Sequence, residues 1–82
     1  MDYLSEIRQI IADILNSPVS SIDPDAEMTD IEGWDSMRNI QILSTIEDHF
    51  GLMIPNDDIF DLTSVRAYAE EIKRLVENNV QS

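Results

Sequence analysis

Apolar residues recur at every third or fourth position in three segments of the chain, which is the periodicity of an amphipathic helix. The segments cover residues 4–15, 35–50 and 63–77. Their apolar positions are Leu4, Ile7, Ile10, Ile11, Ile14 and Leu15, then Met37, Ile40, Ile42, Leu43, Ile46 and Phe50, then Val65, Tyr68, Ala69, Ile72, Leu75 and Val76. No strand pattern competes with these three, so the sequence predicts an all-α protein.

Residues that favour helix ends flank each segment. The first pattern stops at residues 16–18, which include a proline. Asp35 can cap the second helix and Gly51 can end it, while Thr63 or Ser64 can cap the last helix before the pattern fades at residues 78–79. The helix boundaries are therefore predicted independently of the apolar periodicity.

The connection between the first two helices is about 20 residues long, a length that in compact domains is either disordered or functional. It carries five apolar anchors, Val19, Ile22, Met28, Ile31 and Trp34, so we expect an ordered loop, with Trp34 packed against the helices. After Gly51, the segment around Pro55 favours one short helical turn. The predicted fold is a small four-helix bundle with three main helices and one short one.

The length of 82 residues predicts one domain over residues 1–82. The chain has no cysteine and one histidine, which excludes disulfides and thiolate or histidine-rich metal sites, so stability must come from apolar packing. We expect Met28, Met37 and Met53 to fill gaps in the core. No apolar run is long enough to span a membrane, and we expect a soluble, cytoplasmic monomer.

The charge of the chain is strongly negative and uneven. The net charge is −12, and residues 23–61 hold eleven acids against one base, Arg38. This balance argues against binding nucleic acid or an anionic membrane, and it predicts partners with basic surfaces. Simple solubility explains the charge equally well until a chemical motif is found within the acidic stretch.

Ser36 is the candidate for such a motif, because it falls in the first turn of the predicted second helix. Free backbone N–H groups and the helix dipole favour a phosphate ester at that position. A self-sufficient Ser-His hydrolase is excluded, because the only histidine, His49, lies about 20 Å further along the same helix. Ser36 is therefore modified by another enzyme or serves only as a helix cap.

The sequence around Ser36 resembles the acyl carrier protein family, whose attachment motif is Asp-Ser-Leu at the start of the second helix. Asp35, Ser36 and Met37 occupy those places. The resemblance continues through the acidic helix ending in Glu47-Asp48-His49-Phe50-Gly51, then Ile54-Pro55, and the Thr63-Ser64-Val65 opening of the last helix. It covers nearly the whole chain.

This resemblance implies a four-helix carrier without catalysis of its own. A phosphopantetheinyl transferase would attach 4′-phosphopantetheine from coenzyme A to Ser36, and the thiol of the arm would carry acyl or related groups in a fatty-acid, polyketide or other specialised pathway. Acyl-activating, acyltransferase or synthase enzymes with basic patches would dock on the second helix. The docking residues are then Asp35, Met37, Arg38, Glu47 and Asp48.

Two residues depart from the better-known fatty-acid carriers. Met37 replaces leucine with little change in volume. Arg38 places a positive charge where acids are common, which weakens an acidic docking strip and favours a specialised pathway.

Two other classes of protein are alternatives to a carrier. A calcium-binding loop starting at Asp23 fails, because its sixth position is Met28 and its twelfth is Trp34, where glycine and glutamate are required. A helical interaction module without a cofactor stays open and would leave Ser36 as a cap. We expect His49 to be a solvated helix residue; the alternative is that it acts as a pH switch beside Glu47 and Asp48.

Overall fold

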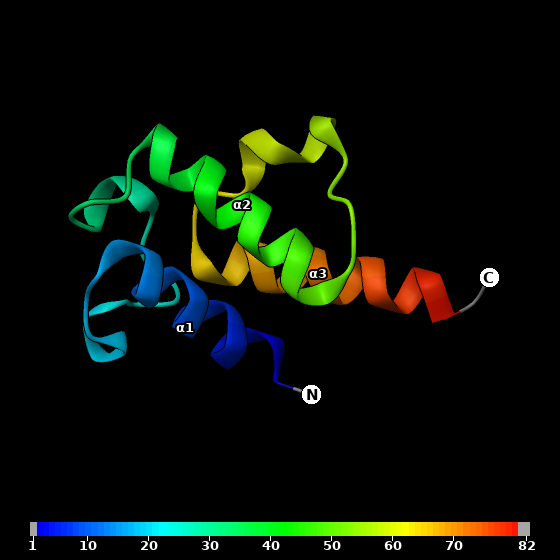
Figure 1. Ribbon diagram of the computed structural model, residues 1–82, viewed down its shortest axis with the longest axis horizontal. Helices are drawn as coiled ribbons and strands as arrows, with labels where there is room; N and C mark the ends of the chain where they lie inside the picture. The colour runs from blue at the N-terminus through cyan, green and yellow to red at the C-terminus, as the bar shows by residue number, and fades with distance from the viewer. Residues whose placement is uncertain (1, 81–82) are drawn as a thin grey trace.

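The computed structural model describes residues 2–80 and is built from helices, with no strand among the residues it describes. The three α-helices are α1 (Tyr3–Leu15), α2 (Ser36–Phe50) and α3 (Val65–Val80). Three short 3₁₀ helices lie in the connections: η1 (Val19–Ser21), η2 (Met28–Asp30) and η3 (Asn56–Asp61). Helix α1 packs against both α2 and α3, and α2 crosses α3 in the view of Figure 1. The small helical bundle predicted from the sequence is confirmed.

The core is one cluster of apolar side chains contributed by all three α-helices and by both connections. Its fully buried members include Ile7 and Ile11 of α1, Ile42 and Ile46 of α2, and Tyr68 and Ile72 of α3. The connections add Ile22, Trp34, Ile54 and Leu62. Because each connection inserts side chains into the same core, neither is free of the bundle.

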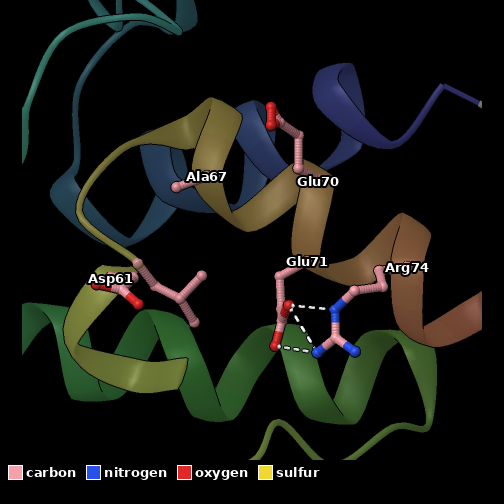
Figure 2. A pocket seen from close by; sticks show the side chains of 6 residues that line it. Asp61, Ala67, Glu70, Glu71 and Arg74 are labelled. Atoms are coloured by element: carbon pink, nitrogen blue, oxygen red, sulfur yellow. Dashed lines mark hydrogen bonds and ion pairs between the residues drawn. The ribbon is translucent and has the colours of Figure 1, made fainter. Parts of the chain in front are cut away.

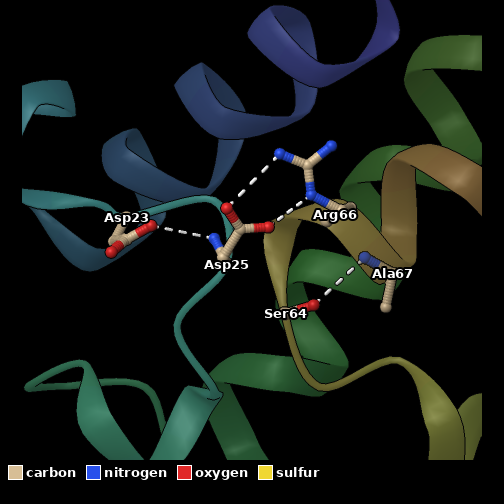
Figure 3. A network of polar contacts seen from close by, with 5 residues as sticks. All are labelled: Asp23, Asp25, Ser64, Arg66 and Ala67. Carbon is tan, nitrogen blue, oxygen red and sulfur yellow. Dashed lines mark hydrogen bonds and ion pairs between the residues drawn. The ribbon is translucent and has the colours of Figure 1, made fainter.

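The ends of α2 form as the sequence predicts. Asp35 is the N-cap, and its Oδ1 accepts a hydrogen bond from the backbone N–H of Arg38 at 2.9 Å. Gly51 ends the helix in the left-handed conformation, with φ of 67°, which favours glycine. Helix α3 is capped by Ser64, whose hydroxyl accepts from the N–H of Ala67 at 3.1 Å, as Figure 3 shows.

The long connection between α1 and α2 is ordered, as predicted, and hydrogen bonds tie it to the start of α3. The N–H of Met28 donates to the carbonyl of Thr63 at 2.7 Å, and the N–H of Arg66 donates to the carbonyl of Pro24 at 3.1 Å. The Arg66 guanidinium also pairs with the carboxylate of Asp25 (Figure 3). These contacts place the loop beside α3 and leave its last residues leading into α2.

Several sequence-based expectations are wrong in detail. Met37 and Met53 do not fill the core: they are 78% and 86% exposed, and only Met28 is partly buried. Ile40, taken as part of the apolar stripe of α2, is 63% exposed because the buried line of that helix runs through Ile42 and Ile46. Helix α3 does not stop before residue 78 but continues to Val80.

The Asp25–Arg66 pair predicts a pH dependence of stability. The guanidinium of Arg66 holds the pKa of the Asp25 carboxyl below its usual value. A carboxyl whose pKa is lower in the folded protein stabilises the fold at pH values above its ordinary, unfolded pKa of about 3.9. This contribution is lost as the pH falls through the lower pKa of the folded state. Asp25→Asn should therefore lower the melting temperature at neutral pH, and the difference from wild type should vanish in acid.

Melting curves measured across the acid range test this expectation. Asp30→Asn removes the same charge from the same loop and serves as the control. Because both members of the Asp25–Arg66 pair are exposed, the difference should also shrink at high salt. An equal effect of the two substitutions at every pH would contradict a role for the pair.

Candidate functional site

Ser36 is the first residue of α2 and its side chain is exposed. It directly follows Asp35, the N-cap. The first hydrogen bond of the helix runs from the N–H of Asn39 to the carbonyl of Asp35 at 2.8 Å. The positive end of the helix dipole lies at this serine. An anionic phosphodiester on its oxygen would be supported electrostatically and would point into solvent.

A polar network lies beneath Ser36 and joins three elements. Oδ1 of Asn39, on α2, accepts hydrogen bonds from the Tyr68 hydroxyl at 2.6 Å and from the indole Nε1 of Trp34 at 3.1 Å. The rings of Trp34 and Tyr68 stack with their centroids 6.5 Å apart. Burial raises the pKa of the Tyr68 hydroxyl, so it stays a neutral donor. The residues on both sides of Ser36 are thus fixed to α3.

Arg38 connects α2 to the end of α1. One guanidinium nitrogen, Nη1, donates to the carbonyl of Ile14 at 3.2 Å. The last carbonyls of a helix lack intrahelical donors and carry partial negative charge, so a cation is favourable there. The positively charged side chain of Arg38, which follows Ser36 by two residues, therefore contacts the C-terminal turn of α1 through this nitrogen.

A surface groove of about 320 Å³ opens beside Ser36. One wall comes from α2 with Asn39 and Ile40, and the other from the second connection with Ile59 and Phe60. The remaining lining residues are Met28 and Thr63, whose main chains are joined by the hydrogen bond described above. Ser36 therefore stands at the edge of a mainly apolar groove, a position from which an attached group can lie along the surface.

The residues predicted to dock partners do not form one cluster. Asp35, Met37 and Arg38 surround Ser36, but Glu47 and Asp48 lie at the far end of α2, about 17 Å away along the helix axis. Oε2 of Glu47 accepts from the N–H of Ile54 at 2.8 Å, so this carboxylate also holds the chain after Gly51 in place. Asp48 is exposed.

His49 lies at the same far end of α2 and is half exposed. Its Nε2 is 3.4 Å from Oε1 of Glu6 on α1. The edge of its ring also meets the neighbouring Phe50 ring. His49 thus bridges α2 to the first turn of α1, at the opposite end of α2 from Ser36.

The carboxylates that suggested a calcium loop bond to groups of the protein itself. Oδ1 of Asp23 accepts from the N–H of Asp25 at 2.9 Å, Asp25 pairs with Arg66 (Figure 3), and Oε2 of Glu27 accepts from the Thr63 hydroxyl at 2.6 Å. Among the residues described, no three His, Cys, Asp or Glu side chains gather as metal ligands would. These acids hold the loop.

A second recess, of about 300 Å³, lies along α3 and does not include Ser36. Figure 2 shows it between the end of η3 and one side of α3, with the Glu71–Arg74 ion pair at 3.0 Å. Its other acids are Asp61 and Glu70. The ion pair joins neighbouring turns of one helix, and this recess is separate from the groove beside Ser36.

Sequence reasoning missed three residues of the site, Asn39, Ile40 and Phe60. Asn39 interrupts an apolar face of α2, and a polar residue in such a position signals a buried hydrogen bond. Phe60 lies between Ile59 and Asp61, outside the three segments with helical apolar spacing, so no periodic pattern indicates it. Ile40 was assigned to the core because its spacing from Met37 and Leu43 matches that of a buried stripe.

The helical bundle and a serine at the start of its second helix define the class of carrier domains, and comparison with known proteins agrees. Residues 5–72 match the family described as phosphopantetheine attachment site. An acyl carrier protein of Streptomyces coelicolor is 30% identical over 74 residues, which cover 89% of this chain and 80% of the relative. That of Acidothermus cellulolyticus is 28% identical over 64 residues, 78% of this chain and 76% of the relative.

The meromycolate extension acyl carrier protein of Mycobacterium tuberculosis is 27% identical over 81 residues, which cover 99% of this chain and 70% of the relative. The chain belongs to the acyl carrier protein family, whose members carry acyl groups on a 4′-phosphopantetheine prosthetic group. Carriers of this family meet a phosphopantetheinyl transferase and biosynthetic enzymes. None of the helices described is long and apolar enough to cross a membrane.

The network beneath Ser36 predicts a stability cost for Asn39→Ala. The substitution removes the acceptor of the Trp34 indole N–H and leaves the Tyr68 hydroxyl only the backbone carbonyl of residue 39, at 3.5 Å, which should cost about 1–3 kcal/mol of unfolding free energy. Gln41→Ala, at an exposed position two residues along the same helix, should stay within about 0.5 kcal/mol of wild type. Denaturant unfolding followed by Trp34 fluorescence measures both, and equal losses would show that the network is not stabilising.

Proposed function

We propose that Ser36 is the residue to which the phosphopantetheine arm is attached. The observation that supports this most directly is its position as an exposed serine on the first residue of α2, directly after the Asp35 cap. The helix N-terminus favours the negative charge of a phosphodiester there. The groove beside the serine offers an apolar surface along which the arm can lie.

In this proposal the chain supplies an oxygen nucleophile and another protein activates it. The Ser36 oxygen forms a bond to the phosphorus that carries the pantetheine of coenzyme A. The pyrophosphate bond of coenzyme A breaks, and adenosine 3′,5′-bisphosphate leaves. The hydroxyl proton must pass to a base on the transferase, since His49 lies at the opposite end of α2. Once bound, the arm supplies a thiol, a group that this cysteine-free chain lacks.

We also propose that the chain is a carrier without catalysis of its own, a single domain over residues 1–82 that acts as a cytoplasmic monomer. We propose that the cargo is an acyl or related unit of a fatty-acid, polyketide or other specialised pathway. The partner classes are acyl-activating, acyltransferase and synthase enzymes. Their basic patches would complement the net charge of −12.

We further propose that Asp35, Met37, Arg38, Glu47 and Asp48 contact these partners. Their contributions should differ, because Asp35, Arg38 and Glu47 each also form a hydrogen bond within the chain. Asp48 is exposed, so a change of its charge should affect partners without disturbing the hydrogen bonds of Asp35, Arg38 and Glu47.

Ser36→Ala should abolish arm attachment and leave the fold intact. The removed hydroxyl is exposed, so the free energy of unfolding should change by no more than about 1 kcal/mol. The measurement is intact-mass spectrometry after incubation with a phosphopantetheinyl transferase and coenzyme A, followed by peptide mapping. Ser44→Ala, which removes an exposed serine from the same helix, is the control and should be modified fully. Modification of the Ser36→Ala protein would disprove the assignment.

Asp48→Lys should slow arm attachment through the association rate, because it weakens attraction to a basic partner. A single surface charge is worth about 0.2–1 kcal/mol, so the effect should be a few-fold and should shrink at high salt. Glu77→Lys makes the same change of net charge at an exposed position on α3 and controls for overall charge. Equal slowing by both variants would mean that net charge, rather than the α2 surface, steers the partner.

A further inference from the structure

Three large apolar side chains in or beside the groove at Ser36 are exposed. Phe60 is 87% exposed, Met37 78% and Ile40 63%, and the exposed large apolar residues of the described chain include all three. Ile40, on α2, and Phe60, on η3, both line the groove that includes Ser36. Met37 follows Ser36 directly in the chain. Apolar side chains gathered around one point of a protein surface mark an interaction site.

The fold does not require a phenylalanine at position 60. Its neighbours Ile59 and Leu62 pack on the core, while the Phe60 ring remains in solvent. The 3₁₀ helix that carries it would form equally well with a polar residue at this position, as its acidic neighbours Asp57 and Asp61 indicate. Phe60 can therefore be replaced without loss of packing.

Any enzyme that reacts with the Ser36 hydroxyl must cover this apolar surface. Ile40 is one turn after Ser36 on the same side of α2, and Phe60 lies across the groove from it. A transferase active site that reaches the Ser36 oxygen thus comes into contact with the groove walls. The charged residues next to Ser36 have fewer groups with which to bind a partner, because one oxygen of Asp35 and one nitrogen of Arg38 already form hydrogen bonds within the chain.

A second copy of this chain is a poor occupant of the surface. Each copy carries a net charge of −12, and the exposed acids Asp35 and Asp61 are the chain neighbours of Ser36 and Phe60. A symmetric contact would bring these acids together, and like charges at an interface oppose association. A partner protein that fits this surface has an apolar recess with basic residues around it.

We propose that Phe60, together with Ile40 and Met37, forms an apolar docking surface for the phosphopantetheinyl transferase, with Phe60 as its anchor in an apolar recess of that enzyme. The proposal rests on attachment at Ser36. Recognition of this chain then depends on burial of an aromatic ring beside the reacting serine, in addition to the attraction of its acids. Aromatic anchors in desolvated pockets account for much of the affinity at protein interfaces.

The test compares Phe60→Gln with Met53→Gln in the full-length protein. Met53 is equally exposed, at 86%, but it follows the C-terminal end of α2 and does not line the groove. Initial rates of arm attachment are measured with a phosphopantetheinyl transferase and coenzyme A, at low and high ionic strength. Phe60→Gln should lower kcat/KM about tenfold or more, through KM, and by the same factor at both salt concentrations. Met53→Gln should change it less than about twofold.

The outcomes separate this proposal from the assignment of Ser36. If the wild-type protein is not modified at Ser36, the assignment itself fails. If wild type is modified and Phe60→Gln performs as well as Met53→Gln, only the docking surface is disproved. A wild-type dimer that Phe60→Gln converts to a monomer, with attachment rates unchanged, would likewise overturn it in favour of self-association. Circular dichroism of both variants establishes that each is folded.

Discussion

The start of α2 depends on one side-chain oxygen, Oδ1 of Asn39. It accepts two hydrogen bonds, from Trp34 in the loop before the helix and from Tyr68 on α3. Donors in a mostly apolar interior need an acceptor, and this atom satisfies both. Because Trp34 precedes Ser36 by two residues and Asn39 follows it by three, the exposed serine is held on a backbone fixed on either side. A fixed backbone of this kind suits an exposed serine that another enzyme has to reach.

The surface above this base combines two kinds of recognition. The acids of the chain act over a distance and favour approach by basic proteins, while the apolar residues beside Ser36 act only in contact. Several acids that look available in the sequence also serve the fold: Glu47 holds Ile54, and Asp25 and Glu27 hold the long loop to α3. A high count of acidic residues therefore overstates how much charge is free for partners.

The helices, their caps and the position of Ser36 could be predicted because each follows from local pattern: apolar spacing, an aspartate before the second helix, a glycine after it. The face of α2 that turns inward was predicted only in part: Ile42, Leu43, Ile46 and Phe50 pack on the core as expected, while Met37 and Ile40 are exposed. Met37 and Ile40 form one apolar set and Ile42 and Ile46 another, and contacts with α1 and α3 decide between them. The loop contacts Asp25–Arg66 and Glu27–Thr63 join residues far apart in the chain, and no local pattern reveals such pairs.

The two backbone hydrogen bonds between the long loop and the start of α3 have a consequence for the order of folding. Met28 bonds to Thr63 and Arg66 to Pro24, so both require closure of a large segment of chain, which costs more conformational entropy than forming a helix turn. These contacts should form after the helices have met. Met28 and Thr63 also line the groove beside Ser36, so we expect the groove to be complete only after these contacts have formed. An enzyme that reads the groove would thereby distinguish finished molecules from partly folded ones before committing a molecule of coenzyme A.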